Sequence, residues 1–294
     1  GAPHEDYEWT KEVMETCFRR THEEQHGFMD GLSLHYYVYP EGIEIKGSST
    51  EFDENVWYKT LNKAVYMDEL IRRHGKIMDE YDPLKKIGMI VDEWGTWYTC
   101  EPGTNPGFLY QQNTMRDALV AGLSLNIFNK HCDRVKMACL AQLVNVIAPI
   151  MTDAAGGAWK QTIFYPFMHA SKYGRGVALL PVMNSTKHAT AKHDEITDVE
   201  SVAVYNEEKD EVTIFAVNRN LEEDVELTTD VRSFEGYRIL EHIVMENEDL
   251  KAGNSLAGEK VYPVTDNERS KLDNGVLTSV IKKASWNAMI RFFI

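Results

Sequence analysis

Apolar runs that end in acidic or aromatic residues recur in the first half of the chain. The run 87–91 carries no charge and leads directly into Asp92 and Glu93, while the run 31–40 ends in polar aromatic residues. A strand without charges is typical of a parallel sheet that is buried on both faces. These two runs therefore predict strands of a parallel sheet.

Helical spacing of apolar residues separates the runs. It predicts a helix over 8–20 and a longer helix over 53–81, which Asp82 and Pro83 end. Farther along, we expect a helix over 111–121, a third strand over 122–128 and a helix over 133–146. The alternation of strand and helix is typical of a parallel α/β sheet or barrel.

After Trp159 the pattern changes to short alternating runs separated by polar turns. The runs cover 201–205, 212–218, 225–229, 237–245, 276–281 and 286–294. Short strands with turn signals between them are typical of an antiparallel β-sandwich. We therefore expect two domains, an α/β domain over 1–160 and a β-sandwich (jelly-roll-like) domain over 161–294.

Composition removes several classes of function. The net charge of −15 and the absence of a run of Lys and Arg argue against nucleic-acid binding. No apolar run approaches the length of a membrane helix, so we expect no membrane partner. Residues 1–20 lack the apolar core of a secretion signal, and we expect a cytoplasmic protein. The four cysteines are scattered, which predicts free, buried thiols rather than a disulfide framework.

Residues 22–26 match the His-Glu-x-x-His motif of zinc proteases, in which two His one helical turn apart hold the metal. The flanking residues are polar, and a strand begins only a few residues later. This context favours a solvated helix end over a zinc site.

The candidate chemistry lies where the predicted strands end. Because active residues of parallel α/β folds gather at the carboxyl ends of the strands, His35, Tyr37 and Glu93 are expected to lie together. A carboxylate followed by Trp94, Trp97 and Tyr98 suits a sugar, whose ring packs on aromatic faces while carboxylates react. The alternatives are a salt-bridged strand-end acid for Glu93 and a hydrogen-bonded core histidine for His35.

One ordered set of short segments resembles glycoside hydrolase family 51, the α-L-arabinofuranosidases. The segments are 6–10, 31–37, 92–94, 97–98, 126–128, 135–138 and 141–146, spread over about residues 1–170. The resemblance implies a (β/α)₈ TIM barrel, of which this chain holds strands 6 to 8, followed by a β-sandwich. It also implies a retaining glycoside hydrolase that releases arabinofuranosyl residues from hemicellulose-derived glycans, without metal or cofactor.

Residue roles carry over by position. The resemblance makes Glu93 the nucleophile, His35 and Tyr37 parts of the site, and Trp97 a packing surface for the sugar. Gln142 would hydrogen-bond the sugar, although an exposed position on the predicted helix 133–146 is the simpler interpretation of that residue. The resemblance further implies arabinofuranoside-containing oligosaccharides or polysaccharides as partners, and a homo-oligomer.

The family's general acid/base is a Glu that follows an Asn at the end of strand 4. The Asn-Glu pairs of this chain start at Asn206, Asn247 and Asn267, all in polar turns of the predicted sandwich. Retaining chemistry needs two carboxylates, so we expect an N-terminal half, as a separate or cleaved chain, to supply the acid. Since the true N-terminus would then lie elsewhere, secretion stays open.

Three other functions fit parts of the pattern. The aromatic residues alone suit a non-catalytic carbohydrate-binding protein. The same barrel also suits a retaining β-xylosidase or endoglucanase, which only a panel of substrates distinguishes from an arabinofuranosidase. A zinc protease, suggested by residues 22–26, is the least supported of the three.

Overall fold

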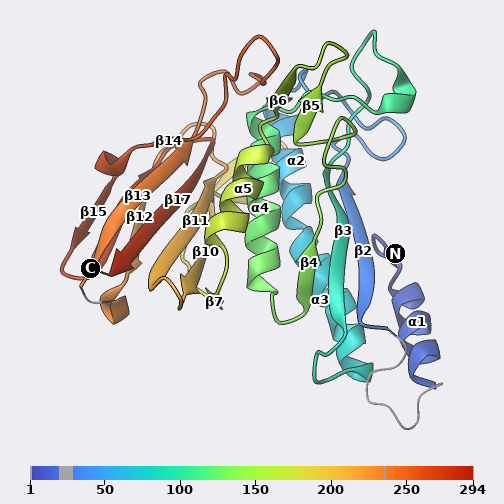
Figure 1. Ribbon diagram of the computed structural model, residues 1–294, viewed down its shortest axis with the longest axis horizontal. Helices are drawn as coiled ribbons and strands as arrows, with labels where there is room; N and C mark the ends of the chain where they lie inside the picture. Colours follow the sequence, from blue (N-terminus) through green and yellow to red (C-terminus); the bar gives the residue numbers. More distant parts are fainter. Residues whose placement is uncertain (1, 20–28, 235, 294) are drawn as a thin grey trace.

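The computed structural model describes residues 2–19, 29–234 and 236–293. A parallel sheet with its helices lies at one end of the molecule and antiparallel sheets lie at the other (Figure 1). The helices α4 (Met115–Lys130) and α5 (Phe164–Tyr173) lie between them. The α/β half and the β half predicted from the sequence are thus both present.

The parallel sheet has the order β1-β2-β3-β4, and every neighbouring pair in it is parallel. Its strands are β1 (Ala2–Pro3), β2 (Gly31–Val38), β3 (Gly88–Thr96) and β4 (Val135–Ala138). The predicted strands over 31–40 and 87–91 are confirmed, and the second continues through Asp92 and Glu93 to Thr96. The short strand β1 adds a neighbour to β2 that the sequence does not reveal, because two residues leave no pattern.

The helices over 8–20 and 53–81 are also confirmed, the second as two consecutive helices. They are α1 (Tyr7–Arg19), α2 (Glu54–Val65) and α3 (Met67–Tyr81). Asp53 caps α2, accepting a hydrogen bond of 2.8 Å from the backbone N–H of Val56. The predicted end at Asp82 is correct, since Asp82 is the C-cap of α3.

Two predictions between residues 111 and 146 are wrong. Residues 122–128 are not a strand but the second half of α4, which is buried on nearly all sides. In this segment Leu123, Leu125 and Ile127 alternate with Ser124 and Asn126, and such a period of two is typical of a strand. Residues 133–146 are not a helix either: they form β4 and an irregular loop after it.

The β half confirms the predicted sandwich. A six-stranded sheet has the order β14-β13-β17-β11-β10-β7, and a three-stranded sheet has the order β12-β16-β15. The strands are β7 (Val177–Leu179), β10 (Val199–Asn206), β11 (Glu211–Asn218), β12 (Val225–Asp230), β13 (Tyr237–Met245), β14 (Val264–Thr265), β15 (Ser270–Asp273), β16 (Val276–Ile281) and β17 (Ser285–Phe293).

Short elements complete the chain. Two hairpins are formed by β5 (Ile150–Thr152) with β6 (Ala158–Lys160), and by β8 (Lys187–Thr190) with β9 (His193–Thr197). Single 3₁₀ turns lie at Pro106–Phe108, Arg232–Phe234 and Asn267–Arg269.

The six-stranded sheet is buried on both faces. One face packs on the three-stranded sheet through residues such as Ile214 and Leu277. The other face packs on α4, where a Cβ atom on Gly122 would come within 2.5 Å of the Trp286 ring. Glycine is therefore required at this position, because it lets the helix backbone approach the indole.

Other predictions have mixed outcomes. None of the four cysteines forms a disulfide, as expected, but none is buried: Cys132 is exposed, and Cys17, Cys100 and Cys139 are partly exposed. No helix in the described ranges is long and apolar enough to cross a membrane. The zinc-like motif at 22–26 lies outside the described residues.

His169 of α5 is buried where the helix meets the sandwich. Its ring lies 5.9 Å from that of Tyr173 and 5.5 Å from that of Trp286, between centroids. Neither ring nitrogen has a hydrogen-bond partner among the described residues. Burial, with a smaller contribution from Lys172, lowers the pKa of His169 to about 4. The protein therefore holds this imidazole in its neutral form.

This burial predicts a loss of stability in acid. Between the unfolded pKa near 6.5 and the folded pKa near 4, the unfolded chain binds the extra proton, so folding weakens as pH falls. The free energy of unfolding should lose up to about 3 kcal/mol from this residue. His169→Phe should remove that part of the pH dependence, measured by urea denaturation at pH 7 and pH 4.5. A constant difference between variant and parent at both pH values would contradict the prediction.

Candidate functional site

A bulge in the pairing of β2 with β3 sets the geometry of the site. Ser33 pairs with Ile90, but His35 pairs with Glu93, so β3 carries one residue more than β2 between the two pairs. A bulge shifts the alternation of side chains along the bulged strand. Val91 and Trp94 are buried at 0% and 1% exposure, whereas Asp92 and Glu93 between them are only half-buried. Two successive carboxylates are thus kept out of the core.

His35 lies between these two carboxylates. Its Nε2 is 3.1 Å from an Asp92 oxygen, and its Nδ1 is 3.8 Å from a Glu93 oxygen. Asp92 also accepts a hydrogen bond of 2.6 Å from Ser33 Oγ. The Asp92 and Glu93 side chains are almost equally exposed, at 40% and 42%. His35 lies closer to Asp92 than to Glu93, so Glu93 is the carboxylate that this histidine holds less tightly.

Tyr37 is a second neighbour of Glu93 from β2. Burial first, and then the charge and a hydrogen bond of Glu93, raise the pKa of the Tyr37 hydroxyl. The same hydroxyl is 3.4 Å from the backbone oxygen of Ala141. Burial and the Glu93 charge also raise the pKa of Tyr39. Both phenols are therefore neutral hydrogen-bonding groups at physiological pH.

Trp97 completes an aromatic wall. Its ring meets the Tyr37 ring edge to face at 5.2 Å between centroids, and lies 6.0 Å from the Tyr39 ring. The ammonium of Lys46 lies 5.7 Å from the centroid of the indole. An aromatic wall beside a half-exposed carboxylate is an arrangement that suits a sugar ligand.

Gln142 lies on a loop and not on the helix over 133–146 that the sequence predicts. It lies on the loop after β4, exposed, and its backbone N–H donates to the oxygen of Val146 at 3.2 Å. The contact of Tyr37 with Ala141 brings the residue before Gln142 to the edge of the site. A loop, rather than the face of a helix, therefore carries the amide.

The structure brings together four of the five predicted residues, namely His35, Tyr37, Glu93 and Trp97, and places Gln142 beside them. Sequence reasoning missed Ser33, Tyr39 and Asp92 as parts of the site. Tyr39 follows the alternation that marks Tyr37 and could have been found, whereas the role of Asp92 depends on the bulge.

The Asn-Glu pairs supply no second carboxylate near Glu93. The residues Glu207, Glu248 and Glu268 of the three Asn-Glu pairs lie in the β half, as the sequence predicts, away from β3. Within the described ranges, no cluster of three or more His, Cys, Asp or Glu could hold a metal ion.

Residues 92–285 match the family model described as the alpha-L-arabinofuranosidase C-terminal domain. The intracellular exo-alpha-(1->5)-L-arabinofuranosidase of Acetivibrio thermocellus is 48% identical over 278 residues, covering 89% of this chain and 53% of the relative. The corresponding enzyme of Halalkalibacterium halodurans is 42% identical, covering 89% and 52%. The chain thus spans about half the length of the curated relatives it matches.

Two solved structures with similar folds are also arabinofuranosidases of family 51. The GH51 arabinofuranosidase from Xanthomonas axonopodis pv. citri superposes with a TM-score of 0.89 at 35% identity, over 99% of this chain and 57% of that one. The family 51 enzyme AbfB of Bifidobacterium longum gives a TM-score of 0.80 at 28% identity, over 97% and 56%.

Proposed function

The chain belongs to the arabinofuranosidases of glycoside hydrolase family 51, and on this premise we propose that it is the C-terminal part of a retaining exo-α-L-arabinofuranosidase. The observation that carries the proposal is the half-exposed Glu93 carboxylate in the C-terminal half of β3, beside His35 and the wall of Tyr37 and Trp97. The names of the relatives support release of terminal arabinofuranosyl residues from oligosaccharides or polysaccharides. Those from A. thermocellus and H. halodurans are named intracellular, which supports the same location.

In the proposed reaction, the Glu93 carboxylate attacks the anomeric carbon of the arabinofuranosyl unit while the bond to the leaving oxygen breaks. A second carboxylic acid gives its proton to that oxygen, leaving a covalent glycosyl-enzyme. The same group then takes a proton from water, which releases arabinose and frees Glu93. His35 and the neutral Tyr37 hydroxyl hold the nucleophile in position, Trp97 packs on the sugar, and Gln142 hydrogen-bonds it.

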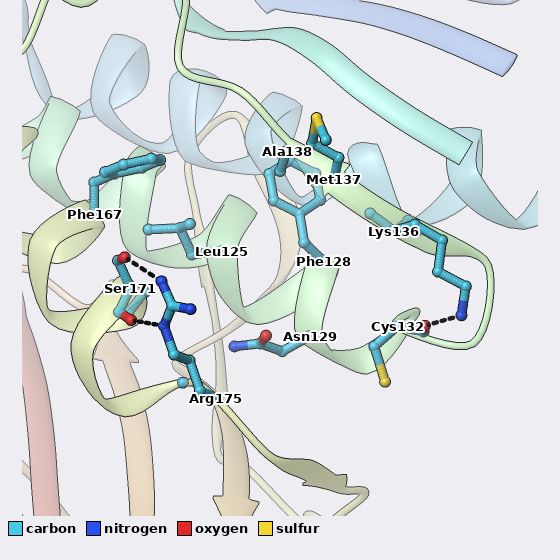
Figure 2. Close-up of a pocket in the computed structure, with 13 residues that line it drawn as sticks. Leu125, Phe128, Asn129, Cys132, Lys136, Met137, Ala138, Phe167, Ser171 and Arg175 are labelled. Atoms are coloured by element: carbon cyan, nitrogen blue, oxygen red, sulfur yellow. Dashed lines mark hydrogen bonds between the residues drawn. The ribbon is translucent and has the colours of Figure 1, made fainter. Parts of the chain in front are cut away.

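We propose that the acid lies on a further part of the barrel, outside these 294 residues. Within the described residues, the parallel sheet stops at β4, which pairs only with β3. A groove of about 350 Å³ lies beside β4, between α4 and α5, and contains none of the five site residues. Figure 2 shows Phe128, Met137 and Phe167 lining it, with Arg175 at its edge. In a closed barrel, strands and helices from the N-terminal half would cover this surface.

The proposal extends to the organisation of the chain. Residues 1–160 would complete the barrel as its strands 6 to 8, with β1 as the preceding strand, and residues 161–294 would form the sandwich domain. The expected homo-oligomer stays a prediction.

Glu93→Ala should reduce kcat on aryl arabinofuranosides by at least about 1,000-fold in the full-length enzyme, because it removes the covalent catalyst. Azide should restore part of the activity and yield an azido sugar of inverted anomeric configuration, detected by NMR. Asp92→Asn is the matched control: it changes the neighbouring carboxylate, should cost less, and should gain nothing from azide. Activity of Glu93→Ala above about a tenth of the parent would rule out the nucleophile role.

His35→Ala and Trp97→Ala should lose less activity than Glu93→Ala. These side chains orient and pack without forming a covalent bond to the sugar, so each should raise the barrier by about 1–3 kcal/mol. The measurement is kcat/KM on the same aryl arabinofuranoside. Losses as complete as that of Glu93→Ala in both variants would contradict these assignments.

The barrel proposal predicts dependence on the N-terminal half. Residues 1–294 expressed alone should be inactive, and co-expression with that half should restore activity through an acid about 5 Å from Glu93. Met137→Glu should prevent this restoration, because the exposed Met137 side chain would be buried when the groove is covered. Val264→Glu, on the exposed edge strand β14, is the matched control. Activity of the 294-residue chain alone would contradict the proposal.

A further inference from the structure

The turn that carries Trp97 is tied to the start of α4 by a set of buried hydrogen bonds. Trp97 stands between Thr96 and Tyr98, both of which are buried at 5% and 1% exposure. Its own backbone N–H donates to the oxygen of Val38 at 3.1 Å. Just before it, Gly95 has a φ of +126°, which only glycine adopts without strain. The indole position therefore depends on how the two flanking residues are fixed.

Asp117 binds both flanking side chains with one oxygen. Its Oδ1 accepts hydrogen bonds of 2.7 Å from Thr96 Oγ1 and of 2.7 Å from the Tyr98 hydroxyl. Its Oδ2 accepts from the backbone N–H and the hydroxyl of Thr114, at 2.8 and 3.1 Å, and so caps α4. Asp117 is only 1% exposed, so each of these bonds is shielded from water.

Gln111 binds the backbone of the same two residues. Its amide nitrogen donates to the oxygen of Thr96 at 2.9 Å, and its amide oxygen accepts from the N–H of Tyr98 at 2.8 Å. Gln111 is 2% exposed. Gln111 is in turn held through its backbone oxygen, which accepts from the amide of Gln161 at 3.1 Å. The side chains and the backbone on both sides of Trp97 are thus fixed separately.

We propose that Asp117 and Gln111 are positioning residues that hold the indole of Trp97 against Tyr37, ready for a sugar. The inference rests on the proposed function for the identity of the ligand. The clamp, by which we mean the hydrogen bonds of Asp117 and Gln111 to Thr96 and Tyr98, does not depend on that function. A side chain that is fixed before binding loses less conformational entropy when the ligand arrives. The clamp therefore acts mainly on substrate affinity, and neither residue needs to touch the sugar.

The test removes the donors and leaves Asp117 and the cap of α4 intact. Thr96→Val and Tyr98→Phe each delete one hydroxyl that binds Asp117, and the two are combined in a double variant. Thr162→Val is the matched control, because Thr162 is equally buried and donates to the backbone oxygen of Thr114 at 2.6 Å, at the start of α4 but away from Trp97. Thermal melting checks that each variant folds; if the double variant does not, Tyr98→Phe alone carries the test.

The first measurement is ¹⁹F NMR of the full-length protein labelled with 5-fluorotryptophan, in which Trp97→Phe identifies the Trp97 resonance. Tyr98→Phe and the double variant should shift or broaden this resonance and leave those of Trp57 and Trp286 in place. Thr162→Val should leave the Trp97 resonance unchanged. An unchanged Trp97 resonance in Tyr98→Phe and in the double variant overturns the proposal.

The second measurement is the kinetics of aryl arabinofuranoside hydrolysis. The double variant should raise KM by about tenfold and change kcat by less than about threefold, since affinity rather than chemistry is affected. A loss confined to kcat, with KM unchanged, overturns the positioning role. If the full-length parent enzyme shows no hydrolysis at all, the proposed function fails, while the NMR result still decides whether the hydrogen bonds of Asp117 and Gln111 hold Trp97.

Discussion

Complete burial of α4 is the constraint on which the arrangement of the molecule depends. Its residues from Met115 to Phe128 are almost all buried, and it contacts β3 on one side and β10, β11 and β17 on the other. A helix that is covered on every side needs two layers, one for each face. The close approach of Gly122 to Trp286 fixes its distance from the sandwich. The β half therefore forms one wall of the core that supports the parallel sheet.

The same constraint explains which elements the sequence predicts correctly. The strands β12, β15 and β16 alternate between more and less exposed residues, and helices such as α3 keep a polar face, so their periodicity is visible in the sequence. The helix α4 is buried on nearly all sides, and in its second half apolar residues alternate with Ser124 and Asn126, so that this segment resembles a strand. The short β4 carries the exposed side chains Lys136 and Met137. Two successive exposed side chains do not show the alternation of a half-buried strand, so the sequence of β4 alone does not reveal that it pairs with β3.

The sequence predicts those residues of the candidate site whose positions follow from the carboxyl ends of the parallel strands. His35, Tyr37 and Glu93 follow apolar runs, and parallel pairing brings such ends together. The bulge between β2 and β3 could not be predicted, because register depends on the partner strand. Asp92 therefore joins the site without any signal of its own. Gln111 and Asp117 were not identified either, since their partners Thr96 and Tyr98 lie 13 to 21 residues away in sequence.

Glu93 and Asp117 show how the environment separates two carboxylates that are equivalent in the sequence. Asp117 is 1% exposed, and both of its oxygens accept two hydrogen bonds, so it has no capacity left for a reacting group. The Glu93 side chain is 42% exposed, and its neighbours in the site are His35 and Tyr37. A nucleophile needs an accessible lone pair, because each donor that binds it stabilises the charge that must attack. A buried structural carboxylate needs the opposite, since every unmatched lone pair would weaken the fold. The carboxylate with free capacity therefore lies in the candidate site, where the proposed function requires a nucleophile, and the saturated one lies at the start of α4, bound to the two residues that flank Trp97.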